Sequence, residues 1–506
     1  MYNSNITRSQ IPAPHPRPVP EYEGPVSARS LQNIFTACSD FESRRIAFGL
    51  DKPLTLPLFW LDGLSSADDI SEQLLQPLTQ ALRSGDAADE QSCLDRILLG
   101  GVYRCAVQLR RDLDSLVTDL THGCCVLVFE TLGAALSFEL RSDTVRAVSE
   151  PTLEKSLKGA KDSFVEILRT NTALVRRRIC SPRLKLAESC LGRKSRTRVA
   201  LLFLEGVADP AVVTELARRL RKLDVDALPA VGILEEALVD EPFSPFPQIL
   251  HTERPDRFAM HLLDGRVGLL VDGLPVGLVL PVNLAEFMKV TGDSSMHFLV
   301  ASGLTMLRYL ALFLSALLPA FYVAVSMYHQ EMIPTRLLLS VIRVEQELPF
   351  STATEVLFML AAFSLLQEAG LRLPNPIGDT VSIIGALIVG QAAVEAKLVS
   401  PIAIIVVAIS GIACYTLPSQ DLGFAVRLAK LALVLAAIAA GLFGVGLVTC
   451  LLLLHLADID SFGRDYTAPL SDGQPGNLAR LLLCRPKTQN RFRDPQLKTP
   501  DRRRQA

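Results

Sequence analysis

Residues 431–457 form a run of 27 residues that contains no Asp, Glu, Lys or Arg. A helix of about 20 apolar residues is long enough to cross the hydrocarbon core of a bilayer. The run therefore predicts a membrane-spanning helix, and it constrains the fold more than any other feature. The mean hydropathy of the 506 residues is +0.31 although 21% of them are charged. Apolar and charged residues must therefore be concentrated in different parts of the chain.

Three further apolar segments in the C-terminal half give four predicted spans. These lie at about 298–327, 378–397, 399–417 and 428–457. Residues 335–373 are amphipathic, because charged residues interrupt them, and we predict interfacial or re-entrant helices there. The alternative is a fifth span over residues 354–372, with its glutamates buried against other helices.

The C-terminal tail, residues 458–506, is basic. Its lysines and arginines include Arg485, Lys487, Arg491, Arg493, Lys498, Arg502, Arg503 and Arg504. The positive-inside rule predicts that such a tail is cytoplasmic and so fixes the orientation. Residues 1–28 are rich in proline and lack the apolar core of a signal peptide, so we expect a disordered tail on the same side. Two cytoplasmic ends require an even number of spans, which favours four.

The N-terminal half has the composition of a water-soluble α/β region. Apolar runs at 124–132 and 199–207 predict buried strands, and they alternate with helical patterns. Asp209 followed by Pro210 predicts the start of a helix. We therefore predict a two-part cytoplasmic α/β region followed by an α-helical transmembrane domain. The expected boundaries are 29–145 for subdomain 1, 146–194 for a basic linker, 195–290 for subdomain 2 and 291–457 for the transmembrane domain.

The predicted linker is dense in arginine and lysine, including the run Arg176-Arg177-Arg178. One interpretation is a solvated helix face that pairs with nearby glutamates and aspartates. The other is contact with anionic lipid headgroups or with the acidic surface of a neighbouring subunit. The sequence leaves both open.

Motifs for enzymatic chemistry are absent from the sequence. There is no phosphate-binding loop, no G-x-S-x-G and no H-E-x-x-H. The string GLFGVG at 441–446 lies inside an apolar span, so we interpret its glycines as packing residues. The ten cysteines are scattered, without metal-ligand spacing, and a net charge of −2 gives no reason to expect nucleic acid. We predict a protein that is not an enzyme and has no cofactor or metal.

The segment 379–398 carries polar residues along one helical stripe. At about 100° per residue, the stripe contains five residues: Thr380, Ile384, Leu387, Gln391 and Glu395. Polar groups in a bilayer normally face a bundle interior or water, so this stripe could line a pore with an apolar constriction at Ile384 and Leu387. Gly385, Gly390 and Ala393 on the other side would allow close helix packing. The alternative is that Gln391 and Glu395 only bind neighbouring helices.

Five long motifs make the chain similar to the GerA family, the A subunits of bacterial spore germinant receptors. The resemblance extends from about residue 45 to 470, and the motifs lie at 150–179, 244–273, 329–335, 368–401 and 455–470.

This resemblance implies an integral membrane protein of the spore inner membrane that pairs with a permease-like B subunit and a lipoprotein C subunit. It also implies a homo-oligomer, a pentamer by analogy with the family, that forms a ligand-gated channel for monovalent cations and triggers germination.

Some positions depart from the family pattern, including Ala160, Asp465 and the segment 293–296. The accessory stage V sporulation AF-type proteins are therefore an alternative within the family. An alternative from another functional class is a non-conducting membrane scaffold that relays the germinant signal.

Overall fold

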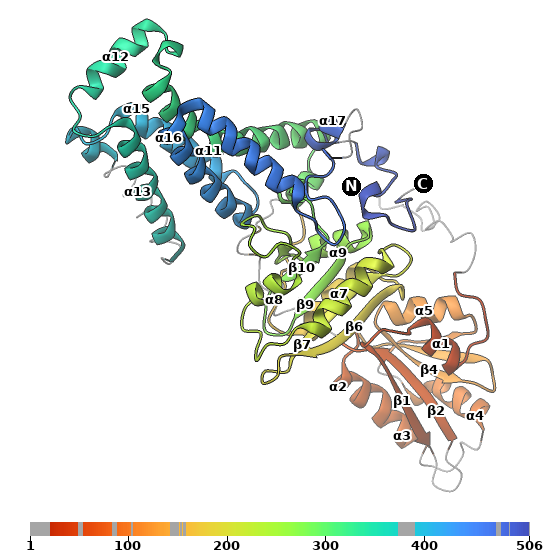
Figure 1. The fold of residues 1–506 in the computed structure, drawn as a ribbon. Helices are drawn as coiled ribbons and strands as arrows, with labels where there is room; N and C mark the ends of the chain where they lie inside the picture. The colour runs from red at the N-terminus through yellow and green to blue at the C-terminus, as the bar shows by residue number, and fades with distance from the viewer. Residues whose placement is uncertain are drawn as a thin grey trace, which may run out of the picture. The chain divides into compact units, whose positions relative to one another are not determined.

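The computed structural model describes residues 21–48, 54–82, 89–102, 105–141, 151, 154, 158–372, 390–471, 477–484 and 486–504. The chain divides into two compact units (Figure 1). The first comprises Met1–Lys155, Ala160–Val231 and His251–Val279, and the second comprises Ser156–Gly159, Gly232–Leu250 and Leu280–Ala506.

A five-stranded sheet forms the first part of the N-terminal unit. In spatial order its strands are β1 (Phe41–Phe48), β2 (Leu54–Leu61), β4 (Cys124–Phe129), β5 (Ala134–Glu139) and β3 (Val107–Arg110), and neighbouring strands are antiparallel. One face packs against α1 (Ala28–Ile34) and α5 (Leu113–Thr121). The other face is covered by η2 (Ile70–Leu75), α3 (Gln76–Leu82), α4 (Glu90–Arg96) and η3 (Ile97–Gly101), and the short helix α2 (Ala67–Asp69) leads into η2.

Strand β4 shows why this sheet has helices on both faces. All six of its residues are buried. Cys125, Leu127 and Phe129 pack on one side, whereas Val126 and Val128 pack on the other. Alternate residues of a strand point to opposite faces, so a wholly apolar strand needs cover on both.

A second five-stranded sheet follows. Its order is β6 (Leu184–Leu191), β7 (Thr197–Leu204), β9 (Val267–Val271), β10 (Gly277–Leu280) and β8 (Leu250–Thr252). The helices in this stretch are α6 (Leu168–Arg178), α7 (Pro210–Lys222), α8 (Val231–Leu238) and α9 (Pro255–Asp264). The predicted helix start is confirmed, because the Asp209 side chain accepts a hydrogen bond from the Ala211 N–H and Pro210 is the first helical residue.

The structure differs from the predicted boundaries at two places. Helix α6 and strand β6 both lie within 146–194, so this segment contains regular elements where we predicted a linker. Val26, predicted to be in a disordered tail, is 3% exposed and belongs to the core of the first sheet.

A buried ion pair joins the two sheets of the first unit. Arg176, in α6, is 1% exposed and donates to both carboxylate oxygens of Asp40 at 2.9 and 2.7 Å. A parallel β-bridge between Cys38 and Leu186 lies beside it. Arg178 pairs with Asp162 on the surface. The pairing of Arg178 with an acidic residue agrees with our first interpretation of the basic run, a solvated helix face. For Arg176 that interpretation is wrong, because this side chain is buried and bound to Asp40.

The second unit is mainly helical. Besides α8, its described helices are α10 (Leu284–Phe287), η5 (Thr291–Ser295), α11 (Phe298–Tyr328), η6 (Gln330–Met332), α12 (Thr335–Glu345), α13 (Thr352–Arg372), α15 (Pro401–Tyr415), α16 (Gln420–Asp458), α17 (Asn477–Leu482), η7 (Lys487–Gln489) and η8 (Pro495–Leu497). One apolar core contains residues of α11, α13, α15 and α16. Figure 1 shows α11 and α16 as two long helices.

The four predicted spans are not all confirmed. Among the described residues, α11 and α16 are the two helices long and apolar enough to cross a membrane. Helix α15 is apolar but has 15 residues. Most of the predicted span at 378–397 lies outside the described residues, which begin again at residue 390.

Candidate functional site in the membrane helices

Helix α16 is broken near its middle. Ala440 has φ −143° and ψ 19°, and Gly441 has φ +60° and ψ −143°. The conformation of Gly441 is essentially restricted to glycine, because a side chain would collide with the backbone. A break inside a membrane helix leaves backbone groups without their helical partners, so other groups must bind them.

Tyr328, the last residue of α11, binds at this break. Its hydroxyl donates a 2.5 Å hydrogen bond to the carbonyl oxygen of Ile438. A Cβ atom on Gly441 would lie 3.1 Å from Cε1 of His329 and 3.1 Å from Cβ of Tyr328. The interpretation of Gly441 as a packing glycine is therefore confirmed, and the break gives it a second role.

A chain of buried polar groups crosses the same bundle. Lys430 in α16 is 6% exposed, and its Nζ lies 3.0 Å from Oγ of Ser410 in α15. That hydroxyl donates to the backbone oxygen of Ser315 in α11 at 2.9 Å. An ionisable residue inside a membrane bundle is costly and therefore usually has a function. Lys430 lies within the predicted span 428–457, but we predicted no role for it.

A buried carboxylate lies near the ends of three helices. Glu355, in the first turn of α13, is 2% exposed. Its Oε2 accepts a 3.1 Å hydrogen bond from the backbone N–H of Ser400, the N-cap of α15. In the sequence, Glu355 is one of the charged residues that interrupt the amphipathic segment 335–373, and that pattern alone predicts no site there.

The predicted pore stripe is described only at its C-terminal end. Gln391 and Glu395 are exposed on a helical turn, and Ala393 of the same turn is 6% exposed within the core. Gly390 is half-buried, and a Cβ there would meet nothing within 4 Å among the described residues. Thr380, Ile384, Leu387 and Gly385 lie outside the described residues, so their roles stay predictions.

The start of α11 is held by a second ion pair. Arg308 donates to both carboxylate oxygens of Asp293, at 2.6 and 2.8 Å, and to the backbone oxygen of Met288 at 3.3 Å. Both side chains of the pair are 12% exposed. Arg308 is the one charge in the first predicted span, and Asp293 lies in the segment that departs from the family pattern.

Two of the family-like motifs meet at the end of α16. Oγ of Ser244, in the motif at 244–273, lies 2.8 Å from Nε2 of His455, in the motif at 455–470. The rings of Phe246 and His455 have centroids 6.1 Å apart. The segment between α8 and β8 is therefore attached to the last long helix.

The basic tail is folded back on itself where it is described. Phe492 and Arg503 form an antiparallel bridge, and the Arg493 guanidinium donates to the backbone oxygens of Asp501 and Arg503. Lys487, Arg491, Arg502 and Arg504 belong to the same described tail, whereas Arg485 lies outside it. Their role in orientation stays a prediction.

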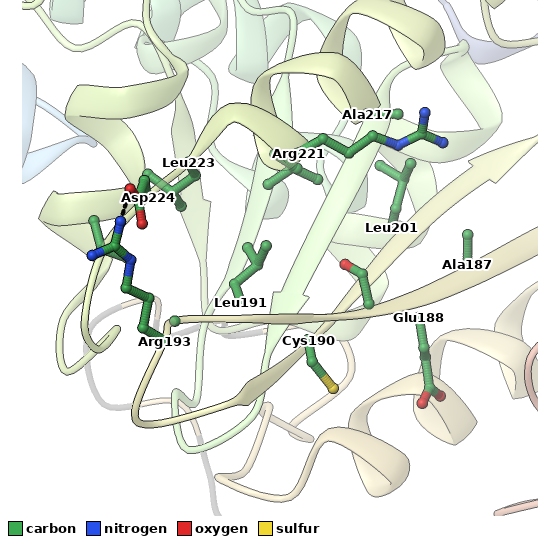
Figure 2. A pocket seen from close by; sticks show the side chains of 14 residues that line it. Ala187, Glu188, Cys190, Leu191, Arg193, Leu201, Ala217, Arg221, Leu223 and Asp224 are labelled. Atoms are coloured by element: carbon green, nitrogen blue, oxygen red, sulfur yellow. Dashed lines mark hydrogen bonds and ion pairs between the residues drawn. The ribbon is translucent and has the colours of Figure 1, made fainter.

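The α/β unit contains an open groove between β6 and α7, with a volume of about 460 Å³ (Figure 2). Its walls include Leu191, Leu201 and Leu220, and Arg193 at one end pairs with Asp224. The described lining residues contain no nucleophile–base pair, so the groove can hold an apolar or anionic group but has no catalytic arrangement.

Comparison with known proteins agrees with the family-like motifs. A family model described as "Bacillus/Clostridium GerA spore germination protein" matches residues 29–496. The chain is 34% identical over 458 residues to Spore germination protein B1 of Bacillus subtilis, covering 90% of this chain and 93% of that protein. It is 35% identical over 434 residues to Spore germination protein KA of the same organism, covering 86% of this chain and 79% of that protein.

A solved structure is also similar. The N-terminal domain of the A subunit of the Bacillus megaterium spore germinant receptor GerK3 is 30% identical, covers 50% of this chain and 91% of that chain, and has a TM-score of 0.40. The match of the family model over most of the length shows where the chain belongs: it is a member of the GerA family of spore germination proteins.

Proposed function

We propose that the chain is the A-type subunit of a spore germinant receptor and that its membrane helices form a cation channel in a homo-oligomer. The observation that carries this proposal is the helical turn at 390–395. Gln391 and Glu395 are exposed there, whereas Ala393 packs into the core of the same subunit. A polar, acidic face directed away from its own bundle is what a subunit contributes to a shared pore.

Exposed apolar side chains on the long helices support an environment of lipid and neighbouring subunits. On α11 and α16 they include Leu307, Leu310, Phe313, Phe443, Leu447 and Leu451. Continuous apolar surfaces of this kind are unstable in water.

The proposed assembly contains a permease-like B subunit and a lipoprotein C subunit in the spore inner membrane, with both ends of this chain on the cytoplasmic side. In this assembly the Ser244–His455 contact gives the segment between α8 and β8 a physical link to α16. Binding of a germinant would be transmitted through such links and would open the pore to monovalent cations.

Cation flux from liposomes containing the purified full chain tests this proposal. Glu395→Gln should lower the flux of monovalent cations several-fold, because it removes the negative charge at the pore mouth. Glu347→Gln is the matched control, since it also removes one exposed glutamate, but one that pairs with Lys397. Equal flux through wild type and Glu395→Gln would overturn the role of Glu395, and no flux at all would favour the scaffold alternative.

A further inference from the structure

Three helices of the second unit each carry a buried, oxygen-bearing side chain near one end. Ser326 lies near the end of α11, Glu355 begins α13, and Ser400 caps α15. Their exposed fractions are 5%, 2% and 3%, respectively. Tyr322, one helical turn before Ser326, lies near the side chains of Ser400 and Ser326 and near the carboxyl groups of Glu355 and Glu345.

This cluster contains two oxygen atoms whose hydrogen-bonding capacity is unused. Oε2 of Glu355 accepts from the Ser400 N–H, but Oε1 is buried and has no hydrogen-bond partner among the described residues. The same holds for Oγ of Ser326. A buried polar atom without a partner usually marks a bound water, ion or ligand, because leaving it empty is unfavourable.

The charge of Glu355 is also unbalanced. In the described part of the chain no lysine, arginine or histidine forms an ion pair with it. Its Oε2 lies at the N-terminus of α15, where it accepts the backbone N–H of Ser400. A buried carboxyl group without an ion-pair partner carries either a proton or a bound cation.

We propose that Glu355 is the anchoring ligand of a site for one monovalent cation, completed by the hydroxyl oxygens of Ser326 and Tyr322. Carboxylate and hydroxyl oxygens are hard donors, which suits an alkali metal ion. Glu345 also lies near Tyr322 but accepts a hydrogen bond from Thr352, so among the described residues Glu355 supplies the one unpartnered carboxylate oxygen here. One such carboxylate matches a single positive charge, whereas protein sites for divalent cations normally recruit several carboxylates. The site lies inside one subunit and needs neither an oligomer nor conduction.

Occupancy would fasten the ends of α11, α13 and α15 to one another. Loss of the ion would leave an uncompensated carboxylate at this junction, so the packing of α13 against α11 would depend on the cation concentration.

Equilibrium binding of ⁸⁶Rb⁺ to the purified full chain in detergent tests the proposal, with choline as the replacement cation. Wild type should bind one Rb⁺ per subunit saturably, and Glu355→Gln should weaken binding by at least about tenfold. Ser326→Ala should weaken it several-fold. Glu347→Gln, which removes an exposed glutamate, should bind like wild type.

Glu395→Gln separates this site from the pore, and Ser326→Ala guards against a Glu355 variant that misfolds. Glu395→Gln should retain the binding, so failure of the pore proposal would leave this result intact. If Glu355→Gln does not yield a monodisperse protein, Ser326→Ala decides the question. The proposal is overturned if wild type shows no saturable binding, if the Glu355 or Ser326 variants bind like wild type, or if infrared spectroscopy at neutral pH shows a protonated Glu355 carboxyl in Rb⁺.

Discussion

The hydroxyl of Tyr328 donates a 2.5 Å hydrogen bond to the carbonyl oxygen of Ile438. This bond joins the last residue of α11 to the segment of α16 just before its break at Ala440 and Gly441. The interior of a bilayer has no water to replace it. The position at which α16 breaks is therefore fixed by a side chain of another helix.

Tyr328→Phe should destabilise the membrane unit, because it keeps the ring but leaves the Ile438 carbonyl without this donor. The expected loss is about 1–3 kcal/mol. Thermal unfolding of the purified chain in detergent measures it. Tyr415→Phe, on an exposed residue of α15, is the control and should change little. Equal unfolding temperatures for wild type and Tyr328→Phe would show that the bond does not stabilise the fold.

Gly441→Ala should be more disruptive than an ordinary glycine substitution in a helix. Its φ of +60° disfavours any side chain, and the new methyl would lie 3.1 Å from the His329 ring. Strain of this kind costs about 1–3 kcal/mol. Gly446→Ala is a matched control in the same helix, because a Cβ there meets nothing within 4 Å. If the Gly441→Ala protein is as stable as the Gly446→Ala protein, Gly441 does not need the positive φ of the break.

Arg176→Leu should destabilise the α/β unit strongly, because Asp40 would remain buried without its partner. Breaking a buried ion pair in this way costs about 3–5 kcal/mol. Urea unfolding followed through the single tryptophan, Trp60, reports on the first sheet of this unit. Arg193→Leu removes an exposed arginine of the Asp224 pair and should cost less than about 1 kcal/mol. Similar losses for the two variants would argue against the buried junction.

Cys93 should resist alkylation in the folded chain. Burial raises the pKa of the Cys93 thiol from its ordinary value of 9.0 to about 11. Because the folded state holds this proton more tightly than the unfolded state, the protonated thiol of Cys93 contributes to the free energy of unfolding. This contribution is fully present below pH 9 and is lost as the pH rises toward about 11. Mass spectrometry after iodoacetamide treatment should find the exposed Cys190 labelled first and Cys93 only after unfolding. Simultaneous labelling of both in the native chain would be inconsistent with this burial.

Much of the fold could be predicted from local patterns. The Asp209-Pro210 start of α7 follows from capping preferences, the buried strand β4 from a short continuous apolar run, and the long apolar helices α11 and α16 from hydropathy. The GerA family could be recognised from motifs that span most of the chain.

The features that could not be predicted depend on contacts between distant residues. The local sequence predicts Arg176 to be a surface residue, because its buried partner Asp40 lies 136 residues away along the chain. The break in α16 depends on Tyr328 and His329, because glycine inside a helix does not by itself specify a positive φ. The buried hydrogen bonds of Glu355 and Lys430 could not be predicted either. They are made with Ser400, the N-cap of α15, and with Ser410 of the same helix, which are distant along the chain.

If the membrane helices form a cation channel, as we propose, the Leu387→Ala protein should leak cations. If Leu387 narrows the pore, replacing it with alanine widens the constriction. Liposomes that contain Leu387→Ala oligomers should then lose monovalent cations several-fold faster than liposomes with wild type, without any germinant. The proposal is contradicted if neither protein passes cations and if spores that carry Leu387→Ala germinate normally. In that case the chain is not a channel subunit.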